Sequence, residues 1–589
     1  MTLEEILIAR HNDIDQIDVI FSREQKVMVE APAGCGKTKT IISLISYLLG
    51  SGQIQYPKRI LALSFSVNAA TKIKLDILLQ LPEIIDAKMV IVDKYIKQVV
   101  ATNYHGLARM VLRKYGYLLN PLLRNIDKMH SIDGSSEQEI IPYIKNEAKM
   151  QFLLAFARAI NDANCKYIKN NIETFNSIIC SDLIPNNAIT YDAILTLAIK
   201  LFADHSPIIE FYKKYFACII IDEYQDTNYL GYLLINHFID ANTRLIVMGD
   251  PLQKIYGFIG ALPKIMQATQ KMFDMKSRVL SKNYRYSDCP DMLALDKVIR
   301  NNASYPEIKE IDEKCSIPLN VFNNQEEEAE WICEKITGIL NDNKDLTIAV
   351  LCNTRGNNIN KIIQKLDEKG INFFYGLFKD TEELYINFHK MCLDLFNYTF
   401  NTKKITPPSL KAFEKQIADH NIKTREVESL LKLLSSFFQT VLTEYLFLSE
   451  EERKNIIRET FDSLSLRQNM KITNKKIVVS TIHGAKGLEW DYVFMSDMEQ
   501  FVNPGFFSCS ACIKGKFNKI IGDSCNVKFS KDFERQFLDM LSIFYVGSTR
   551  AKKQVIYTSS RKRIGRQDLD EKTYISCFLN LPGIELAIK

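Results

Sequence analysis

Residues 26–49 of the chain read KVMVEAPAGCGKTKTIISLISYLL, and this stretch falls into three parts. Residues 27–29 predict a short strand, residues 31–36 a loop of small side chains, and Lys37 begins an apolar helix. Small residues let backbone N–H groups converge on phosphate oxygens, and the positive end of the following helix strengthens the attraction. The stretch therefore predicts a phosphate-binding loop between a strand and a helix.

The loop also supplies side chains suited to a nucleoside triphosphate. Lys37 can reach the terminal phosphates, and the hydroxyl of Thr38 can bind Mg²⁺. Ala31 stands where the pattern G-x-x-x-x-G-K-(S/T) has its first glycine, so an ordinary glycine-rich turn is the alternative. With the flanking strand and helix, we expect ATP and Mg²⁺ to bind here. The residues expected to contribute are Ala31, Pro32, Ala33, Gly34, Cys35, Gly36, Lys37 and Thr38.

A second stretch, FACIIIDEYQDTN at residues 216–228, begins with an uninterrupted apolar run. Such a run predicts a parallel strand that is buried on both faces. Asp222 and Glu223 follow at its carboxyl end, where open α/β sheets bind ligands. Asp222 can hold the hydrated Mg²⁺, and Glu223 can orient and deprotonate the attacking water. Two solvated acids are the alternative, but together with the phosphate loop the pair predicts ATP hydrolysis.

A third strand is expected in RLIVMGDPLQKIYGFIGA, residues 244–261. The loop after it carries Gln253, whose amide can sense a γ-phosphate by hydrogen bonding without adding charge. The same loop carries Tyr256 and Phe258, and exposed aromatic rings can stack on nucleic-acid bases. Local core packing is the alternative for these two rings.

The bulk properties describe a multidomain protein of ordinary globular composition. The chain has 589 residues, 47% of them hydrophobic and 25% charged, and its formal net charge is +5. That length exceeds one hydrophobic core, and so weak a charge does not by itself predict a nucleic-acid partner. The acidic N-terminus is unlike a secretory signal, and no apolar run approaches the roughly 20 residues that span a bilayer. We expect a cytoplasmic protein with no membrane partner.

The 13 cysteines are scattered, which fits reduced thiols better than a disulfide framework. Only Cys509, Cys512 and Cys525 form a cluster with the spacing of metal ligands. A zinc site needs four ligands, and neither a second pair of cysteines nor a nearby histidine completes this set. We predict no structural metal.

Six sequence blocks together resemble the UvrD/Rep family of superfamily 1 DNA helicases. In chain order they are GCGKT, IIIDEYQDTN, GDPLQKIYGFIGA, NYR, TIHGAKGLEW and YVGSTRAK. The resemblance runs from about Gln16 to Lys552, whereas a P-loop kinase or GTPase would explain only the first two blocks. It implies an α/β fold with two RecA-like P-loop domains on parallel sheets, each carrying a mainly helical inserted subdomain.

The resemblance assigns further roles at the nucleotide. Gln16 would read the adenine edge, Tyr284 would stack on the adenine, and Glu489 would lie near the ribose. Arg285 and Arg550 would grip the γ-phosphate, a task that suits planar, permanently charged guanidinium groups. The expected catalytic set is Lys37, Asp222, Glu223, Gln253, Arg285 and Arg550.

The resemblance also implies contacts with single-stranded DNA. The residues expected to make them are Phe65, Asn68, His105, Tyr256, Phe258 and His483. Three positions depart from the family pattern: Phe258 replaces a tryptophan, Asn103 a threonine, and Ile259 an arginine. These departures leave the catalytic set intact and concern the strength of unwinding.

The motifs also suggest how the chain is divided. The expected parts are 1–107 and 200–285 for the first RecA-like domain, 108–199 for its helical insertion, 286–380 and 471–589 for the second RecA-like domain with the C-terminal tail, and 381–470 for a shortened second helical insertion. The expected function is that of an ATP-dependent DNA helicase or single-stranded DNA translocase, with 3′-to-5′ polarity implied by the family. Its expected partners are single-stranded DNA, tailed duplexes and a nuclease or repair protein. The alternative is a DNA-sensing ATPase subunit of a nuclease-containing anti-phage complex such as Gabija.

Overall fold

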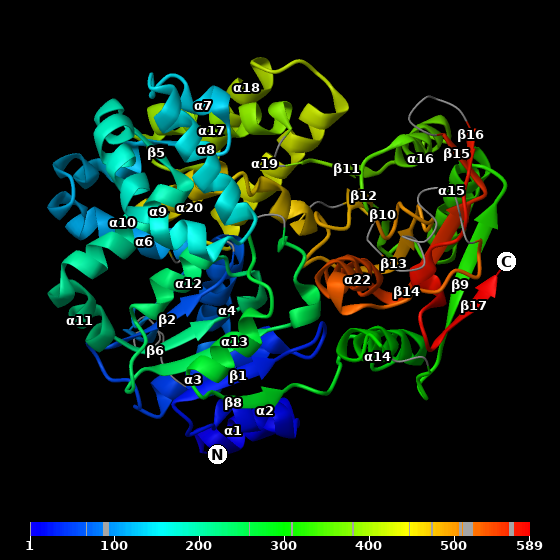
Figure 1. Cartoon of the computed structure of the whole chain (residues 1–589), viewed down its shortest axis with the longest axis horizontal. Coiled ribbons are helices and arrows are strands. Elements are labelled where there is room, and N and C mark those ends of the chain that lie inside the picture. Colours follow the sequence, from blue (N-terminus) through cyan, green and yellow to red (C-terminus); the bar gives the residue numbers. More distant parts are fainter. Residues whose placement is uncertain are drawn as a thin grey trace. The chain divides into compact units, whose positions relative to one another are not determined.

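The computed structural model places the chain in two compact units, Met1–Lys282 and Asn283–Lys589. The residues that it describes are 2–65, 67–85, 94–257, 260–307, 310–379, 382–446, 448–472, 475–505, 509, 522–564 and 570–588, with the main chain alone at 68, 85, 471 and 472. Among these residues, no helix has both the length and the apolar character that crossing a membrane requires. Figure 1 shows the elements of both units.

The first unit is built on a parallel sheet of six strands. In spatial order they are β3 (Val99–Thr102), β2 (Arg59–Leu63), β6 (Phe216–Ile221), β7 (Arg244–Gly249), β1 (Lys26–Glu30) and β8 (Lys276–Val279). The strands predicted around residues 27–29, 216–221 and 244–249 are confirmed. Because β6, β7 and β1 are neighbours and pair in parallel, the loops that follow them emerge at one edge of the sheet.

Helices cover both faces of this sheet (Figure 1). Outside the insertion they are α1 (Leu3–His11), α2 (Ile14–Ile20), α3 (Lys37–Gly50), α4 (Val67–Ile85), α6 (Tyr104–Tyr115), α11 (Ser206–Tyr215), α12 (Tyr229–Asn236) and α13 (Ile265–Met272). Side chains alternate along β1: Val27 and Val29 join a buried cluster with α3, whereas Met28 joins the cluster on the other face. The sheet is therefore buried on both sides, as its apolar strands predicted.

The first insertion is mainly helical and shares its core with the sheet. Its elements are η1 (Gly116–Leu118), η2 (Pro121–Lys128), β4 (His130–Ile132), α7 (Glu137–Ile140), α8 (Glu147–Asn161), α9 (Cys165–Ile178), η3 (Ile179–Leu183), η4 (Ile184–Asn186), β5 (Ala188–Thr190) and α10 (Tyr191–Asp204). β4 and β5 form a short parallel pair that the sequence did not predict. The expected borders at 107/108 and 199/200 fall inside α6 and α10, because both helices pack into one continuous core.

The second unit has a parallel sheet of seven strands. In spatial order they are β11 (Phe374–Gly376), β12 (Ile477–Thr481), β10 (Ile348–Cys352), β13 (Trp490–Met495), β14 (Ala551–Ser560), β9 (Cys315–Phe322) and β17 (Ile584–Ile588). Its helices are α14 (Pro290–Ser304), α15 (Gln325–Asp342), α16 (Asn357–Glu368) and α22 (Glu534–Ser548), and β15 (Lys562–Ile564) pairs antiparallel with β16 (Asp570–Lys572). α16 ends just before Gly370, which adopts φ +64°, as is common for the glycine that follows a helix.

A four-helix insertion interrupts this second sheet. Its helices are α17 (Glu383–Phe400), α18 (Pro407–Asp419), α19 (Arg425–Thr443) and α20 (Glu450–Asp462). Rings from all four helices form its core, including Phe396, Phe413, Phe438 and Phe461. These aromatic side chains therefore form the hydrophobic core of the insertion.

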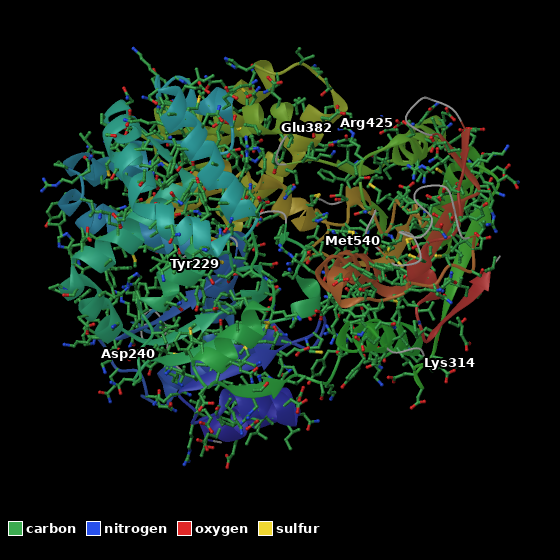
Figure 2. The ribbon with its side chains drawn as sticks, viewed as in Figure 1. Tyr229, Asp240, Lys314, Glu382, Arg425 and Met540 are labelled. Carbon is green, nitrogen blue, oxygen red and sulfur yellow. The ribbon has the colours of Figure 1, made fainter. Side chains whose placement is uncertain are left out.

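Ion pairs fasten this insertion to the α/β part of the same unit. Arg355 Nη1 lies 3.1 Å from Glu382 Oε1, and Arg425 Nη2 lies 2.6 Å from Asp367 Oδ2. Glu382 precedes α17 and Arg425 begins α19 (Figure 2). Two separate helices of the insertion are thus tied to the region around α16.

The border between the units differs from the expected one at residue 285. The first unit ends at Lys282, and the residues after Asn283 pack in the second unit. Arg285 Nη1 donates to the Thr549 carbonyl oxygen at 2.8 Å, and the Tyr286 hydroxyl donates to the same oxygen at 3.0 Å. These hydrogen bonds explain why Tyr284 and Arg285 belong to the second unit.

Gly260, in the loop after β7, lies against helix α8 of the first insertion. The effect of a substitution on stability can test this close approach. Gly260 adopts φ +86°, and a Cβ there would lie 2.1 Å from the carbonyl oxygen of Ile160 in α8. Gly260→Ala should lower the free energy of unfolding by about 2 kcal/mol or more, because it adds a clash to an unfavourable φ. The measurement is urea unfolding followed by circular dichroism.

Gly338 in α15 is the matched control, because a Cβ there meets nothing within 4 Å. Gly338→Ala should stabilise its helix by about 0.5–1 kcal/mol. A Gly260→Ala protein as stable as the wild type would contradict the close approach to Ile160.

Candidate functional site

The phosphate loop joins β1 to α3 at the carboxyl edge of the first sheet. Ala31 N–H donates to the Gly249 carbonyl oxygen at 2.9 Å, so the loop starts against the end of β7. Gly34 and Gly36 adopt φ +84° and +78°, a region that favours glycine. Gly36 has no side chain with which to cap α3, so no side chain occupies the anion-attracting N-terminus there.

Lys37 forms a compact charge cluster with the two acids after β6. Its Nζ lies 3.0 Å from Asp222 Oδ1 and also donates to Glu223 Oε1. Burial alone would lower the pKa of Lys37, but the two carboxylates outweigh it and raise that pKa above its ordinary value. Burial raises the pKa of Asp222, and Lys37 opposes that rise. Lys37 is therefore protonated, and its charge is balanced by two acids.

A chain of hydrogen bonds links Glu223 to the loop after β7. Gln225 Nε2 donates to Glu223 Oε2, and Gln225 Oε1 accepts from Asp250 N–H at 3.1 Å. Gln253 Nε2 then donates to Asp250 Oδ2 at 2.7 Å. Glu223 itself adopts φ +53°, a strained conformation of the kind that clusters at functional sites.

Sequence reasoning did not assign Gln225 or Asp250 a role. Both lie inside motifs that it quoted, DEYQD and GDPLQ, so the signal was present. What the sequence could not give was their pairing, which depends on β6 and β7 being neighbours in the sheet.

Gln16 lies behind the phosphate loop and is completely buried. Its Nε2 donates to the carbonyl oxygen of Cys35 at 3.0 Å, and its Oε1 accepts from the ring of His11. One amide hydrogen and one oxygen lone pair remain for a base. His11 was not singled out from the sequence, because nothing in its local pattern marks it.

The residues proposed for Mg²⁺ offer oxygen atoms of the kind that this ion prefers. Thr38, in the first turn of α3, supplies a hydroxyl, and Asp222 supplies a carboxylate. Within the described parts of the chain, no group of three or more His, Cys, Asp or Glu side chains could hold a metal ion. The pair therefore fits an ion that takes its remaining ligands from phosphate and water.

The cysteine cluster is only partly visible. Cys509 Sγ accepts a hydrogen bond from Lys528 N–H at 3.2 Å, and burial, with a smaller contribution from Cys509, raises the pKa of the Cys525 thiol. Cys512 lies outside the described residues, so the prediction of no structural metal stays a prediction.

The second unit gathers four of the predicted nucleotide residues. Glu489 and Arg550 directly precede β13 and β14, whose parallel register sets Trp490 opposite Ala551. Arg285 Nη2 lies 2.9 Å from Glu489 Oε2, and Tyr284, next to it in the chain, is 38% exposed.

Arg550 is held more tightly than Arg285. It is 2% exposed, its Nε donates to the Val546 carbonyl oxygen at 2.9 Å, and its Nη1 donates to the Leu488 carbonyl oxygen at 3.3 Å. Backbone carbonyl groups of α22 and of the segment before β13 therefore hold its guanidinium group in place.

Two predicted strand-contacting aromatics meet at the edge of the first sheet. Phe65 follows β2 and Tyr256 follows β7, and their rings stack with centroids 4.8 Å apart and an interplanar angle of 16°. Partly buried rings at a sheet edge form a surface on which bases can stack. Phe258 and the side chain of Asn68 lie outside the described residues.

The two predicted histidines lie in different units. His105 is in α6, and its buried Nε2 has no hydrogen-bond partner among the residues that the structure describes. Burial lowers the pKa of His105 to about 4, so the ring is neutral. His483 lies in the turn after β12. Asn103, in the position of the family threonine, caps α6 by accepting from Gly106 N–H at 2.7 Å.

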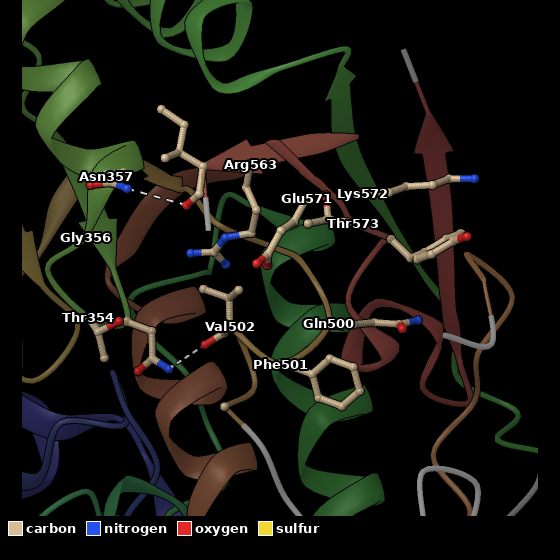
Figure 3. Close-up of a pocket in the computed structure, with 14 residues that line it drawn as sticks. Thr354, Gly356, Asn357, Gln500, Phe501, Val502, Arg563, Glu571, Lys572 and Thr573 are labelled. Carbon is tan, nitrogen blue, oxygen red and sulfur yellow. Dashed lines mark hydrogen bonds between the residues drawn. The ribbon is translucent and has the colours of Figure 1, made fainter. Parts of the chain in front are cut away.

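A pocket of about 590 Å³ opens in the second unit beside the loops after β10 and β13 (Figure 3). Asn353 Nδ2 donates to the Val502 carbonyl oxygen at 2.8 Å across part of it, and Arg563, Glu571 and Lys572 give it mixed charge. Of the predicted nucleotide and DNA residues that the structure describes, none lines this pocket.

The fold and the strand–loop–helix segment GCGKT define a P-loop protein with two RecA-like α/β units. Residues 13–274 match the family model of the UvrD/REP helicase N-terminal domain, and residues 379–562 match that of the UvrD-like helicase C-terminal domain. The chain therefore belongs to the UvrD/Rep helicase family.

Named relatives extend this similarity along most of the chain. The ATP-dependent DNA helicase PcrA of Staphylococcus aureus is 23% identical over 660 residues, with 95% of this chain and 85% of the relative covered. A probable DNA helicase II homolog of Mycoplasma pneumoniae is 23% identical over 628 residues, with 90% and 81% covered. Both alignments are longer than the 589-residue chain, so the relatives carry segments that this chain lacks.

The charge cluster gives a pH-dependent stability test. Lys37→Met should lower the free energy of unfolding by about 3 kcal/mol at pH 8, because it leaves Asp222 buried without its cation. Without Lys37 the pKa of Asp222 rises further, and a carboxyl with a raised folded-state pKa favours folding at low pH. The deficit should therefore shrink as the pH falls to 5, as measured by urea unfolding.

The control is Lys149→Met, which breaks the more exposed Lys149–Asp182 pair at 2.8 Å. Its cost should stay below about 1 kcal/mol. A Lys37→Met deficit that is the same at pH 8 and pH 5 would contradict the role given to Asp222.

Proposed function

We propose that this chain is an ATP-dependent DNA helicase or single-stranded DNA translocase. The observation that carries the proposal is the cluster of Lys37, Asp222 and Glu223 at one sheet edge, in a chain that belongs to the UvrD/Rep family. Relatives whose printed names are ATP-dependent DNA helicase and probable DNA helicase II homolog support it.

ATP binding would exchange one set of charges for another. The phosphates would draw Lys37 away from Asp222 and Glu223, because they offer it a larger negative charge. Asp222 and the Thr38 hydroxyl would then hold Mg²⁺, which supplies charge neutralisation at the phosphates when it is bound. Glu223, released from Lys37, would accept a proton from the attacking water.

Other predicted residues would complete nucleotide binding. The spare amide hydrogen and lone pair of Gln16 match the N7 acceptor and the N6 donor on one edge of adenine. Tyr284 would stack on the base, and Glu489 would lie near the ribose. Arg285 and Arg550 would bind the γ-phosphate, which requires each to exchange contacts within its own unit for phosphate oxygens.

The hydrogen-bond chain from Glu223 would report hydrolysis to the strand-binding surface. It ends at Gln253, three residues before Tyr256, whose ring stacks on Phe65. A change in the phosphates would shift Gln253 and so the loop that carries Tyr256. Repeated grip and release of a strand by this surface would give movement, with His105 and His483 adding contacts.

The anti-phage subunit is the second candidate. The relatives align over more residues than this chain contains, which fits a compact form of the family. Such a subunit would hydrolyse ATP on DNA but unwind little without its nuclease.

The first functional test concerns Glu223. Wild-type ATP hydrolysis should rise sharply when single-stranded DNA is added, and Glu223→Gln should lower the stimulated rate by about 10²–10⁴-fold while ATP still binds. Exposed Glu24→Gln is the control and should leave the rate unchanged. Turnover that ignores DNA in the wild type would count against the proposal.

The second test joins the stacking surface to polarity. The wild type should unwind duplexes with a 3′ tail but not those with a 5′ tail. Phe65→Ala should weaken the affinity for single-stranded DNA by about 1–3 kcal/mol, because it removes a ring on which bases stack. Tyr398→Ala, at an 85% exposed tyrosine of α17, is the control and should bind like the wild type. Equal unwinding of both tails would refute the polarity, and strong ATP hydrolysis without unwinding would favour the anti-phage subunit.

A further inference from the structure

Four groups form a buried row of hydrogen bonds behind the phosphate loop. The Ser43 hydroxyl lies 2.7 Å from His11 Nε2, His11 Nδ1 bonds Gln16 Oε1, and Gln16 Nε2 donates to the Cys35 carbonyl oxygen at 3.0 Å. Ser43, His11 and Gln16 are 0%, 3% and 0% exposed. Water therefore has little access to the row, and each group depends on its neighbours for hydrogen bonds.

The order of donors in this row is fixed by chemistry. A carbonyl oxygen only accepts, so the Gln16 atom facing Cys35 is the amide nitrogen and the atom facing His11 is the oxygen. His11 Nδ1 must then carry the proton, and in a neutral ring Nε2 must accept from the Ser43 hydroxyl. Burial, with the nearby Lys39 and Arg10 charges, lowers the pKa of His11, so the neutral ring is the form present at pH 7.

The last hydrogen bond of the row acts on the phosphate loop itself. The Cys35 carbonyl and the Gly36 N–H belong to one planar trans peptide, so they point in opposite directions. When Gln16 holds the carbonyl on its own side, the Gly36 N–H is turned to the other side of the loop. Gly36 has no Cβ and adopts φ +78°, so its N–H can approach a phosphate oxygen closely.

The local sequence brings His11 and Gln16 together. α1 ends at His11, Asn12 turns the chain at φ +45°, and Asp13 begins α2 by accepting from the N–H groups of Asp15 and Gln16. This turn sets the last residue of one helix against the first turn of the next. The two helices pack beside α3, which supplies Ser43.

We propose that His11 is a positioning residue for nucleotide binding: through Gln16 it fixes the Cys35–Gly36 peptide so that the Gly36 N–H is ready for phosphate. The inference rests on the proposed function and adds to it a residue that does not touch the nucleotide. A loop already ordered in the free protein binds more tightly, because less freedom is lost on binding.

Two substitutions of His11 separate the proposed role from simple packing. The amide nitrogen of Asn reaches about the place of Nδ1, whereas that of Gln reaches about the place of Nε2. His11→Asn should therefore keep the bond to Gln16, and His11→Gln should lose it, as should His11→Leu. Binding of ADP, measured by calorimetry, should weaken about 3- to 10-fold in the Gln and Leu variants and less than twofold in the Asn variant.

Two serines of α3 give a matched second comparison. Ser43 and Ser46 are both completely buried, but Ser46 donates to the Ile42 carbonyl oxygen at 2.8 Å and lies outside the row. Ser43→Ala should weaken ADP binding about twofold to threefold, because His11 loses the donor that fixes its tautomer. Ser46→Ala should bind ADP like the wild type.

Steady-state rates supply a readout that a merely structural role would not move. KM for ATP should rise in His11→Gln and His11→Leu while kcat at saturating ATP stays within about twofold. The inference is overturned if these two variants bind ADP within twofold of the wild type, or if His11→Asn is weakened as much as His11→Leu. A wild type that binds no ADP would instead overturn the proposed function, and the inference with it.

Discussion

Parallel pairing of β6 with β7, and of β7 with β1, is the constraint on which the candidate site depends. All three strands run the same way, so their following loops arrive at one edge, where Lys37 meets Asp222 and Glu223. The sheet brings Lys37 into contact with Glu223 although 186 positions separate them in the sequence. In this cluster two acidic side chains balance one buried cation, and in the proposed function a triphosphate and its metal ion would replace that balance.

In the second unit, parallel strands also bring predicted nucleotide residues together, but at the amino ends of the strands. The register of β13 with β14 sets Trp490 opposite Ala551, which brings Glu489 and Arg550 together just before the two strands begin. Arg285 joins them through Glu489, although it reaches the group from a segment outside the sheet. A sheet register thus explains why residues of separate motifs gather in one place. In both units the sheet determines position, and the loops supply the chemistry.

How much the sequence predicted depended on how local each cause was. The strand at 216–221 and the helix at 37–50 follow from apolar runs and small-residue loops, which short stretches reveal. The compact units divide at Lys282 rather than at the expected residue 285, because Arg285 and Tyr286 bond to Thr549, more than 260 residues away. The sequence did not reveal roles for His11 and Gln225 for the same reason. Each acts through a hydrogen-bond partner that only the folded chain brings near.

The glycine that ends β7 also owes its place to a partner distant in the sequence. A Cβ on Gly249 would lie 2.4 Å from Gln225 Oε1, the atom that accepts from Asp250 N–H. A larger residue would therefore separate Glu223 from the loop that bears Gln253 and Tyr256. Gly249 also receives the first hydrogen bond of the phosphate loop, through its carbonyl oxygen and Ala31 N–H. One small residue at the end of a central strand thus holds the phosphate loop, the strand-end acids and the stacking loop in a single network.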